Sequence, residues 1–398
     1  MSGVNEGEST GEETDHLAWA QFVQTQEADQ LASELVKVAA ESARVERVKA
    51  DIIEAAMQML GRKGPLTAEQ RDRLLEEQLH ELDEPHARQL LDMHIKQIRG
   101  AYEILDLPDL GGITASSLPA GTINAMCVRD PGDQSLHVFA DTELIIFVQA
   151  LSKLVVSSVF PTSIGQRIIP RVFTGLIKFD QLFFFKLTNF FGAVVFTGRA
   201  RASVPWRAEP VTVAQAAILT WAMQRFATAH ELAHFSAGHL DITEIAVSSG
   251  GRDEMEAQQA QEVEADALAV RACSVCIDPS IYPELQALAP YIFLKGIELL
   301  EAGQTVVSSG TAVVVSAHPP TPDRLKALKA TIIAEADFEL MLARVFTLQH
   351  LDVLFAEWRS YLLPHLRQMK ASGRAPHLER RRRTREHDRP EILGSVVR

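Results

Sequence analysis

The sequence has little cysteine, no excess of basic charge and no nucleotide-binding loop. Its 398 residues include three cysteines, too few for a secreted disulfide framework, so a reducing compartment is expected and the cytoplasm is the default location. Acidic residues outnumber Lys plus Arg by 52 to 39, which argues against a general nucleic-acid binder. Without a Gly-rich phosphate loop or a Gly-x-Ser-x-Gly elbow, nucleotide-driven and serine-hydrolase chemistry have no support.

A secretory signal and a membrane span are not expected either. The polar, acidic start of the chain lacks the basic and apolar blocks of a signal peptide. The apolar clusters at 182–185 and 190–196 are interrupted by Lys186 and Asn189, well short of the roughly 18 residues that a spanning helix needs. We expect their phenylalanines to pack in a core, with an exposed patch for peripheral membrane contact left open as the alternative.

Composition divides the chain into four segments. Residues 1–16 have little to bury, which predicts a disordered acidic tail. Apolar residues at three- and four-residue spacing over 17–107 predict a helical N-terminal region. Residues 108–370 hold the strands and motifs of a larger domain, and the Arg-rich residues 371–398 are expected to form a disordered basic tail.

The larger domain is expected to combine a small sheet with many helices. Two β-prone runs at 122–129 and 135–140 predict a hairpin, whose exposed edge can hold an extended peptide by main-chain hydrogen bonds. Residues 160–206 show no clear period and are expected to form a buried, irregular insertion. Helices are expected at 142–157, 213–237, 253–275, 283–301, 321–334 and 338–363.

One motif carries metal chemistry, His230-Glu231-Leu232-Ala233-His234, in the last two turns of the helix expected at 213–237. Residues at i and i+4 share one helix face, so His230 and His234 can present two imidazoles to one tetrahedral zinc ion. Glu231 projects beside that face, where its carboxylate can take a proton from a metal-activated water and deliver it to the leaving amine. This spacing indicates a zinc-dependent hydrolase.

A catalytic zinc needs a third protein ligand, and Glu262 on the following helix is the best candidate. Glu262 and Asp266 share one face, so Glu262 can bind the metal while Asp266 accepts a hydrogen bond from a ligand histidine. Glu264 is expected to point away. His239, just after the expected helix stop at Gly238, is a weaker candidate, the alternatives being a surface histidine or one that hydrogen-bonds to a ligand.

Two other patterns carry less weight. The metzincin pattern fails because Ala237 and Leu240 stand where it requires glycine and histidine. Cys273-x-x-Cys276 is a single pair, whereas a structural zinc site needs two such pairs or added histidines. We therefore expect these two cysteines, and Cys127 in a predicted strand, to be packing residues.

The ordered blocks resemble a known family. His230-Glu231-Leu232-Ala233-His234, then Glu262-x-x-x-Asp266, then His318-Pro319-Pro320 with Arg324 is similar to the gluzincin metallopeptidases of the HtpX and CAAX-prenyl-endopeptidase type, over roughly residues 120–330. The resemblance implies that the first two blocks supply the zinc ligands and the base. It also implies that His318 or Arg324 stabilises the oxyanion or holds substrate. Many members of that family are membrane-embedded, whereas this chain carries a long helical N-terminal extension.

Two weaker resemblances concern the substrate. The string from Arg225 to His234 is similar to soluble regulatory metallopeptidases that cut repressors, and the continuation Gly238-His239-Leu240-Asp241 is similar to phage-exclusion peptidases of the Lit type. All three resemblances share the zinc chemistry and differ in the substrate that they imply.

The sequence thus predicts an α+β fold: a mainly helical, zincin-like domain with a small β-sheet, preceded by a helical N-terminal region. The predicted activity is that of a zinc-dependent endopeptidase acting on a protein or peptide, with Zn2+ on His230, His234 and Glu262 and with Glu231 as the base. Two alternatives stay open: a non-catalytic partner-binding protein with a structural or vestigial zinc site, and a zinc hydrolase of a non-peptide substrate.

Overall fold

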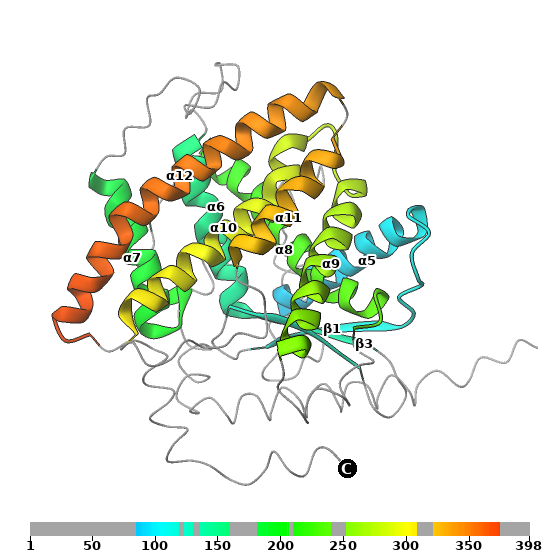
Figure 1. Ribbon diagram of the computed structural model, residues 1–398, viewed down its shortest axis with the longest axis horizontal. Coiled ribbons are helices and arrows are strands. Elements are labelled where there is room, and N and C mark those ends of the chain that lie inside the picture. The colour runs from blue at the N-terminus through cyan, green and yellow to red at the C-terminus, as the bar shows by residue number, and fades with distance from the viewer. Residues whose placement is uncertain are drawn as a thin grey trace, which may run out of the picture.

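The computed structural model describes residues 85–118, 123–129, 136–159, 181–204, 206, 210–239, 252–308, 321–336 and 338–374 (Figure 1). The predicted acidic tail, most of the N-terminal region, the basic tail from residue 375 and His318 lie outside these residues. Within them the fold is mainly helical with a small mixed sheet, so the predicted α+β class is confirmed.

The described helices follow the predicted pattern with longer ends in several places. The helix expected at 321–334 is found with those bounds, whereas the last one continues to Ala371. It continues past Pro364, and Leu362 and Leu366, on either side of the proline, are both fully buried in the core. The helices are α5 Pro85–Ile104, α6 Thr142–Val159, α7 Gln181–Thr197, α8 Pro210–Ser236, α9 Arg252–Val275, α10 Pro283–Val307, α11 Thr321–Ala334 and α12 Phe338–Ala371, with a 3-10 turn η2 Ala200–Ala202.

The prediction of an irregular insertion at 160–206 is wrong for its described second half. Residues 181–197 form α7, whose side chains are apolar on nearly every face. A helix that is apolar all round shows no 3.6-residue period, which is why the sequence pattern missed it. Phe190 and Phe191 are buried as expected, while Leu182 and Phe185 are more than half exposed at the start of the helix.

In the described part of the chain the sheet has three strands in the order β1-β3-β2, with bounds β1 Ile113–Leu118, β2 Ala125–Arg129 and β3 Leu136–Asp141. β2 pairs antiparallel with β3, which confirms the predicted hairpin. β1 was not predicted and pairs parallel with β3. β3 is buried along its length and lies between the other two, so among the described strands β2 forms one edge of the sheet.

α8 is the central element of the molecule. It packs against α5, α6, α9, α10 and strand β2, so the motif helix is surrounded by the rest of the core. In Figure 1 the sheet lies along the lower side of the helical body, and its strands β2 and β3 contact α8. α5 belongs to the same core through residues such as Ile98 and Tyr102, although it comes from the predicted N-terminal region. These contacts hold α8 and α9 side by side, which positions the site.

α6 is, among the described residues, the helix long and apolar enough to cross a membrane by length and composition. Its 18-residue window has a mean hydropathy of 1.5, and 78% of that window is buried inside the molecule. One such helix is weak grounds for a membrane span, because a core helix has the same properties. In this fold α6 packs directly against α8.

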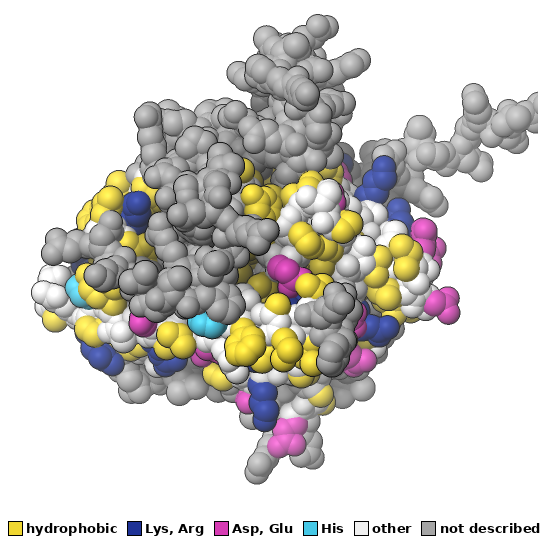
Figure 2. All heavy atoms as spheres, turned by 90° about the horizontal axis from the view of Figure 1, so that it is seen from above, with side chains coloured by type: hydrophobic (Ala, Val, Ile, Leu, Met, Phe, Trp, Pro, Cys, Tyr) yellow, Lys and Arg dark blue, Asp and Glu magenta, His cyan; other side chains and the backbone are white. Residues whose placement is uncertain are grey.

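The described surface carries charges of both signs. On the face shown in Figure 2, Lys and Arg side chains lie interspersed with Asp and Glu among hydrophobic ones. Hydrophobic side chains among charged ones are usual on the surface of a globular protein, because apolar atoms make up more than half of a typical accessible surface.

Candidate metal centre

The end of α8 places the two motif histidines. Beyond Ser236 the chain leaves the helix through Gly238, whose φ of 74° is a left-handed conformation that glycine adopts without strain. The amide of Ala237 still donates to the Ala233 carbonyl, at 2.9 Å, so the helix is intact up to that turn. The predicted helix stop at Gly238 is confirmed, and His230 and His234 lie one turn apart on the same face.

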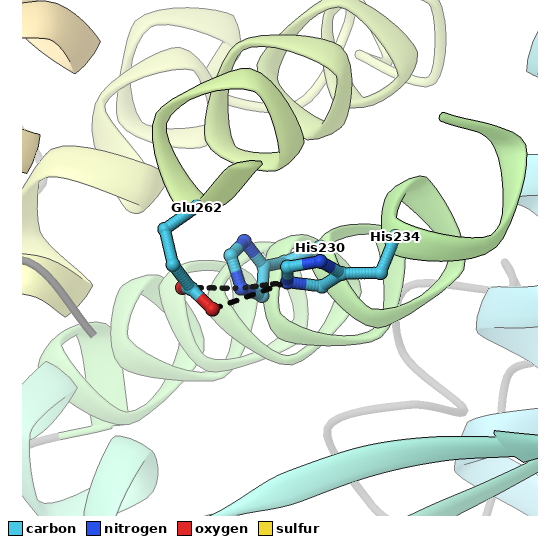
Figure 3. A group of neighbouring side chains, drawn as sticks. All are labelled: His230, His234 and Glu262. Atoms are coloured by element: carbon cyan, nitrogen blue, oxygen red, sulfur yellow. Dashed lines mark hydrogen bonds and ion pairs between the residues drawn. The ribbon is translucent and has the colours of Figure 1, made fainter. Parts of the chain in front are cut away.

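His230, His234 and Glu262 converge from two neighbouring helices (Figure 3). The Nε2 atoms of the histidines are 3.2 Å apart. Glu262 Oε2 lies 3.3 Å from His230 Nε2, and Glu262 Oε1 lies 3.4 Å from His234 Nε2. Figure 3 shows the three side chains pointing toward one another, with Glu262 reaching from α9 to the two rings on α8. The structure therefore brings the three predicted ligands together.

These separations fit a tetrahedral metal site. Zinc bonds of about 2.0–2.1 Å at tetrahedral angles place neighbouring ligand atoms roughly 3.3 Å from one another. The two Nε2 atoms, 3.2 Å apart, lie close to that value. Each histidine is 3.3 or 3.4 Å from a different oxygen of Glu262, and with one ligand atom per residue the three donors lie within 4.8 Å of one another. Imidazole nitrogens and carboxylate oxygens are donors that zinc accepts, so the group is able to hold a metal ion of this kind.

The charges around the cluster favour a cation. Against the lowering effect of burial, three carboxylates raise the pKa of a single guanidinium, that of Arg324: those of Asp266, Glu262 and Glu231. These four groups therefore carry more negative than positive charge. Burial lowers the pKa of His230, but hydrogen bonds to Asp266 and Glu262 and the charge of Asp266 outweigh it and raise that pKa to about 10. A proton thus occupies the imidazole when no metal competes for it, and a metal ion would have to displace that proton.

Asp266 holds the first histidine from the side opposite Glu262. Its Oδ1 lies 3.0 Å from His230 Nδ1, and its carboxylate is 1% exposed. Arg324 donates to both oxygens of Asp266, and its Nη1 lies 3.3 Å from Glu262 Oε2. Asp266 is therefore where the sequence predicted it. The proposed contact of Arg324 with an oxyanion stays a prediction, and so does the role of His318, which lies outside the described residues.

The second histidine has a different neighbour. His239 Nδ1 lies 3.0 Å from His234 Nδ1, and His239 Nε2 lies 3.3 Å from Glu264 Oε2. His239 is thus beside a ligand candidate and not among the three converging donors. Burial, followed by the charge of His234, lowers the pKa of His239 despite its contact with Glu264. The sequence did not predict the contact between Glu264 and His239, because Glu264 was expected to point away from the site.

Glu231 lies beside the cluster, against the sheet. Its Oε2 accepts a hydrogen bond of 3.2 Å from the backbone amide of Cys127 in β2. In the register of the hairpin Cys127 is opposite Val138. Strand β2 and Glu231, the candidate base, are therefore in direct contact. The sequence pattern of each segment alone could not predict this contact.

The cysteines lie in the protein packing. Cys273 is buried, and burial raises the pKa of its thiol to about 12. Cys276 is partly buried; burial also raises the pKa of its thiol, which donates to the Gln97 carbonyl at 3.4 Å. Thiols with raised pKa values are protonated near neutral pH and are poor metal ligands. This agrees with the packing role expected for them.

Comparison with known proteins gives no match to a family model, a curated protein or a solved structure. The class of the protein therefore follows from its own fold and site. It is a mainly helical α+β protein in which two histidines and a glutamate on adjacent helices form a group able to hold a metal ion.

Proposed function

We propose that the protein is a zinc-dependent endopeptidase. The observation that carries this proposal is the convergence of one donor atom each from His230, His234 and Glu262 within 4.8 Å, with Glu231 on the same turn of α8 but outside the donor set. A site of three protein ligands leaves one position open, as catalytic zinc sites do and closed structural sites do not. A carboxylate beside such a site is the usual proton carrier in hydrolysis.

His230, His234 and Glu262 would hold the ion. Zinc bound by them would activate a water molecule for attack on a carbonyl group. Glu231 would take the proton from that water and deliver it to the leaving amine. Asp266 and Arg324 keep the His230 ring in one orientation, so that its Nε2 faces the site.

The edge strand favours a peptide among possible substrates. Among the described strands β2 pairs only with β3, so its other side is the sheet edge nearest Glu231. An extended peptide can add to such an edge by main-chain hydrogen bonds, independently of its side chains. A bond of that peptide would then lie beside the candidate base. This supports a peptidase over a hydrolase of small, non-peptide substrates.

Metal content and cleavage test the proposal together. Purified wild type is expected to hold one zinc per chain, and Glu262→Ala much less. Wild type is expected to cleave members of a peptide library or a proteome digest, and a chelator should stop this cleavage. Glu231→Gln should keep its zinc and lose roughly 100-fold or more of the cleavage rate. Equal zinc in wild type and Glu262→Ala, or cleavage that survives in Glu231→Gln, would contradict the proposal.

A further inference from the structure

The surroundings of His234 carry an inference that rests on the proposed metal centre and extends it. We infer that His239 is a positioning residue, which orients the His234 ring for metal binding and is itself anchored by Glu264. His239 would not be a ligand. The inference follows from where its two ring nitrogens lie and from the protonation pattern that those positions require.

The chain geometry brings His239 back onto the end of α8. Gly238 turns the backbone at positive φ, and the next residue lies beside the last helical turn. The rings of His234 and His239 have centroids 5.1 Å apart at an angle of 64°. The His239 side chain is 7% exposed, so it is packed in place and does not extend freely into solvent. Its Nδ1 atom, at 3.0 Å from His234 Nδ1, is at hydrogen-bonding distance.

Metal binding would determine the protonation of this pair. A histidine that binds metal through Nε2 carries its proton on Nδ1 when the ring is neutral. His234 would therefore donate from Nδ1, and His239 has to accept with its own Nδ1. A neutral His239 then carries its proton on Nε2, which lies 3.3 Å from the carboxylate of Glu264. Each donor in the series meets an acceptor, and no ring has to be charged.

The two candidate ligands are thus supported in different ways. His230 meets the buried carboxylate of Asp266 directly. On its Nδ1 side, His234 meets His239, which in turn contacts the carboxylate of Glu264, and Glu264 is 61% exposed. A hydrogen bond to a ligand histidine fixes its tautomer and the direction of its ring, and loss of such a partner typically costs 10- to 100-fold in metal affinity. Because Glu264 is exposed to solvent, loss of His239 is expected to lower the metal affinity by about 10-fold, the lower end of this range.

The experiment measures metal affinity in four variants of the full chain. Zinc affinity is determined by competition with a chromogenic chelator, and the absorption spectrum of bound Co2+ reports the ligand set. His239→Leu removes the acceptor for His234 and should weaken zinc binding about 10-fold. His239→Asn supplies an amide oxygen near the former Nδ1 and should restore most of the affinity. Glu264→Ala should weaken binding severalfold, while Glu256→Ala, on the exposed face of the same helix, serves as the control without effect.

The outcomes separate this inference from the metal centre itself. If wild type binds no metal, the proposed function fails. If wild type binds zinc and His239→Leu binds it equally well with an unchanged Co2+ spectrum, the positioning role is overturned while the centre stands. Equal loss in His239→Leu and His239→Asn, with an altered Co2+ spectrum, would overturn it in favour of His239 as a ligand. If His239→Leu does not fold, the zinc affinities of His239→Asn and Glu264→Ala decide. Near wild-type affinity in His239→Asn with a severalfold loss in Glu264→Ala supports the role, and wild-type affinity in both variants overturns it.

Discussion

Arg324 holds Asp266 by two hydrogen bonds of 2.8 Å, from Nε to Oδ2 and from Nη2 to Oδ1. Burial alone would raise the pKa of Asp266, but the hydrogen bonds from Arg324 and His230 lower it below the usual value. The carboxylate is thereby kept ionised and fixed in position, although it is almost completely buried. The direction of the His230 ring is therefore built into the protein before any metal binds.

Arg324→Met is expected to lower the free energy of unfolding of the metal-free protein by about 3 kcal/mol, because it leaves a buried carboxylate without its main partner. The measurement is urea denaturation in the presence of a chelator. Arg324→Lys should recover only part of the loss, since an ammonium group cannot make the two parallel hydrogen bonds.

The matched control is Arg271→Met on α9. Arg271 lies 4.0 Å from Glu335 and is 45% exposed, so its removal should cost less than about 1 kcal/mol. Equal stability of the Arg324 and Arg271 variants would show that the pair with Asp266 does not stabilise the fold.

Zinc is expected to raise the stability of wild type and not that of a ligand variant. A ligand that binds only the folded state adds about 2.7 kcal/mol at a concentration 100 times its dissociation constant. The midpoint of thermal unfolding should therefore rise with added zinc and return on chelation. His234→Ala should show no such rise, whereas His350→Ala, on the distant helix α12, should respond like wild type. A rise of the same size in His234→Ala would place the stabilising metal elsewhere.

The site was predictable to the extent that it depends on helix periodicity. His230 and His234 share a face by their spacing, as do Glu262 and Asp266, and the glycine that ends α8 has a local conformational cause. What brings these two faces together is the packing of α8 against α9, which no local pattern encodes. β1 was missed because its small polar residues resemble a loop, and it becomes a strand only by pairing with β3.

The contact of His239 with His234 was missed for a related reason. The backbone turn at Gly238 decides on which side of the helix the next residue lies, and the partner Glu264 comes from another helix. Sequence spacing identified His239 as a candidate but could not decide between a ligand and a neighbour of a ligand. Only the three-dimensional arrangement assigns its two nitrogens to different partners.

Acid is expected to destabilise the protein through His94, whose ring lies against Trp221 in the core. Burial, followed by the charge of Arg225, lowers the pKa of His94 to about 3. The folded state therefore binds fewer protons than the unfolded state between about pH 3 and 6.5. The contribution of neutral His94 to the free energy of unfolding is complete above pH 6.5 and is lost as the pH falls. Between pH 7 and pH 5 the loss should be about 2 kcal/mol.

His94→Leu isolates this effect, because leucine does not titrate. Urea denaturation of both proteins at pH 7 and pH 5 should show a smaller decrease in the variant, by about 2 kcal/mol. His350→Leu provides the control for loss of a partly buried histidine on α12. A decrease of equal size in wild type and His94→Leu would mean that another group causes the acid sensitivity.

Two helical glycines should respond to alanine in opposite directions. A Cβ atom on Gly296 in α10 would clash with the Cδ2 methyl of Leu151, a fully buried side chain of α6. Gly296→Ala is therefore expected to lower the free energy of unfolding by about 1 to 3 kcal/mol through overpacking, more than the helix propensity of alanine returns. Gly100 in α5 has no atom within 4 Å of the added position. Gly100→Ala should thus stabilise the protein by roughly 0.5–1 kcal/mol, because alanine lowers the entropic cost of the helix. Urea denaturation of the two variants side by side checks this, and stabilisation by both would show that α6 and α10 are not in close contact at Gly296.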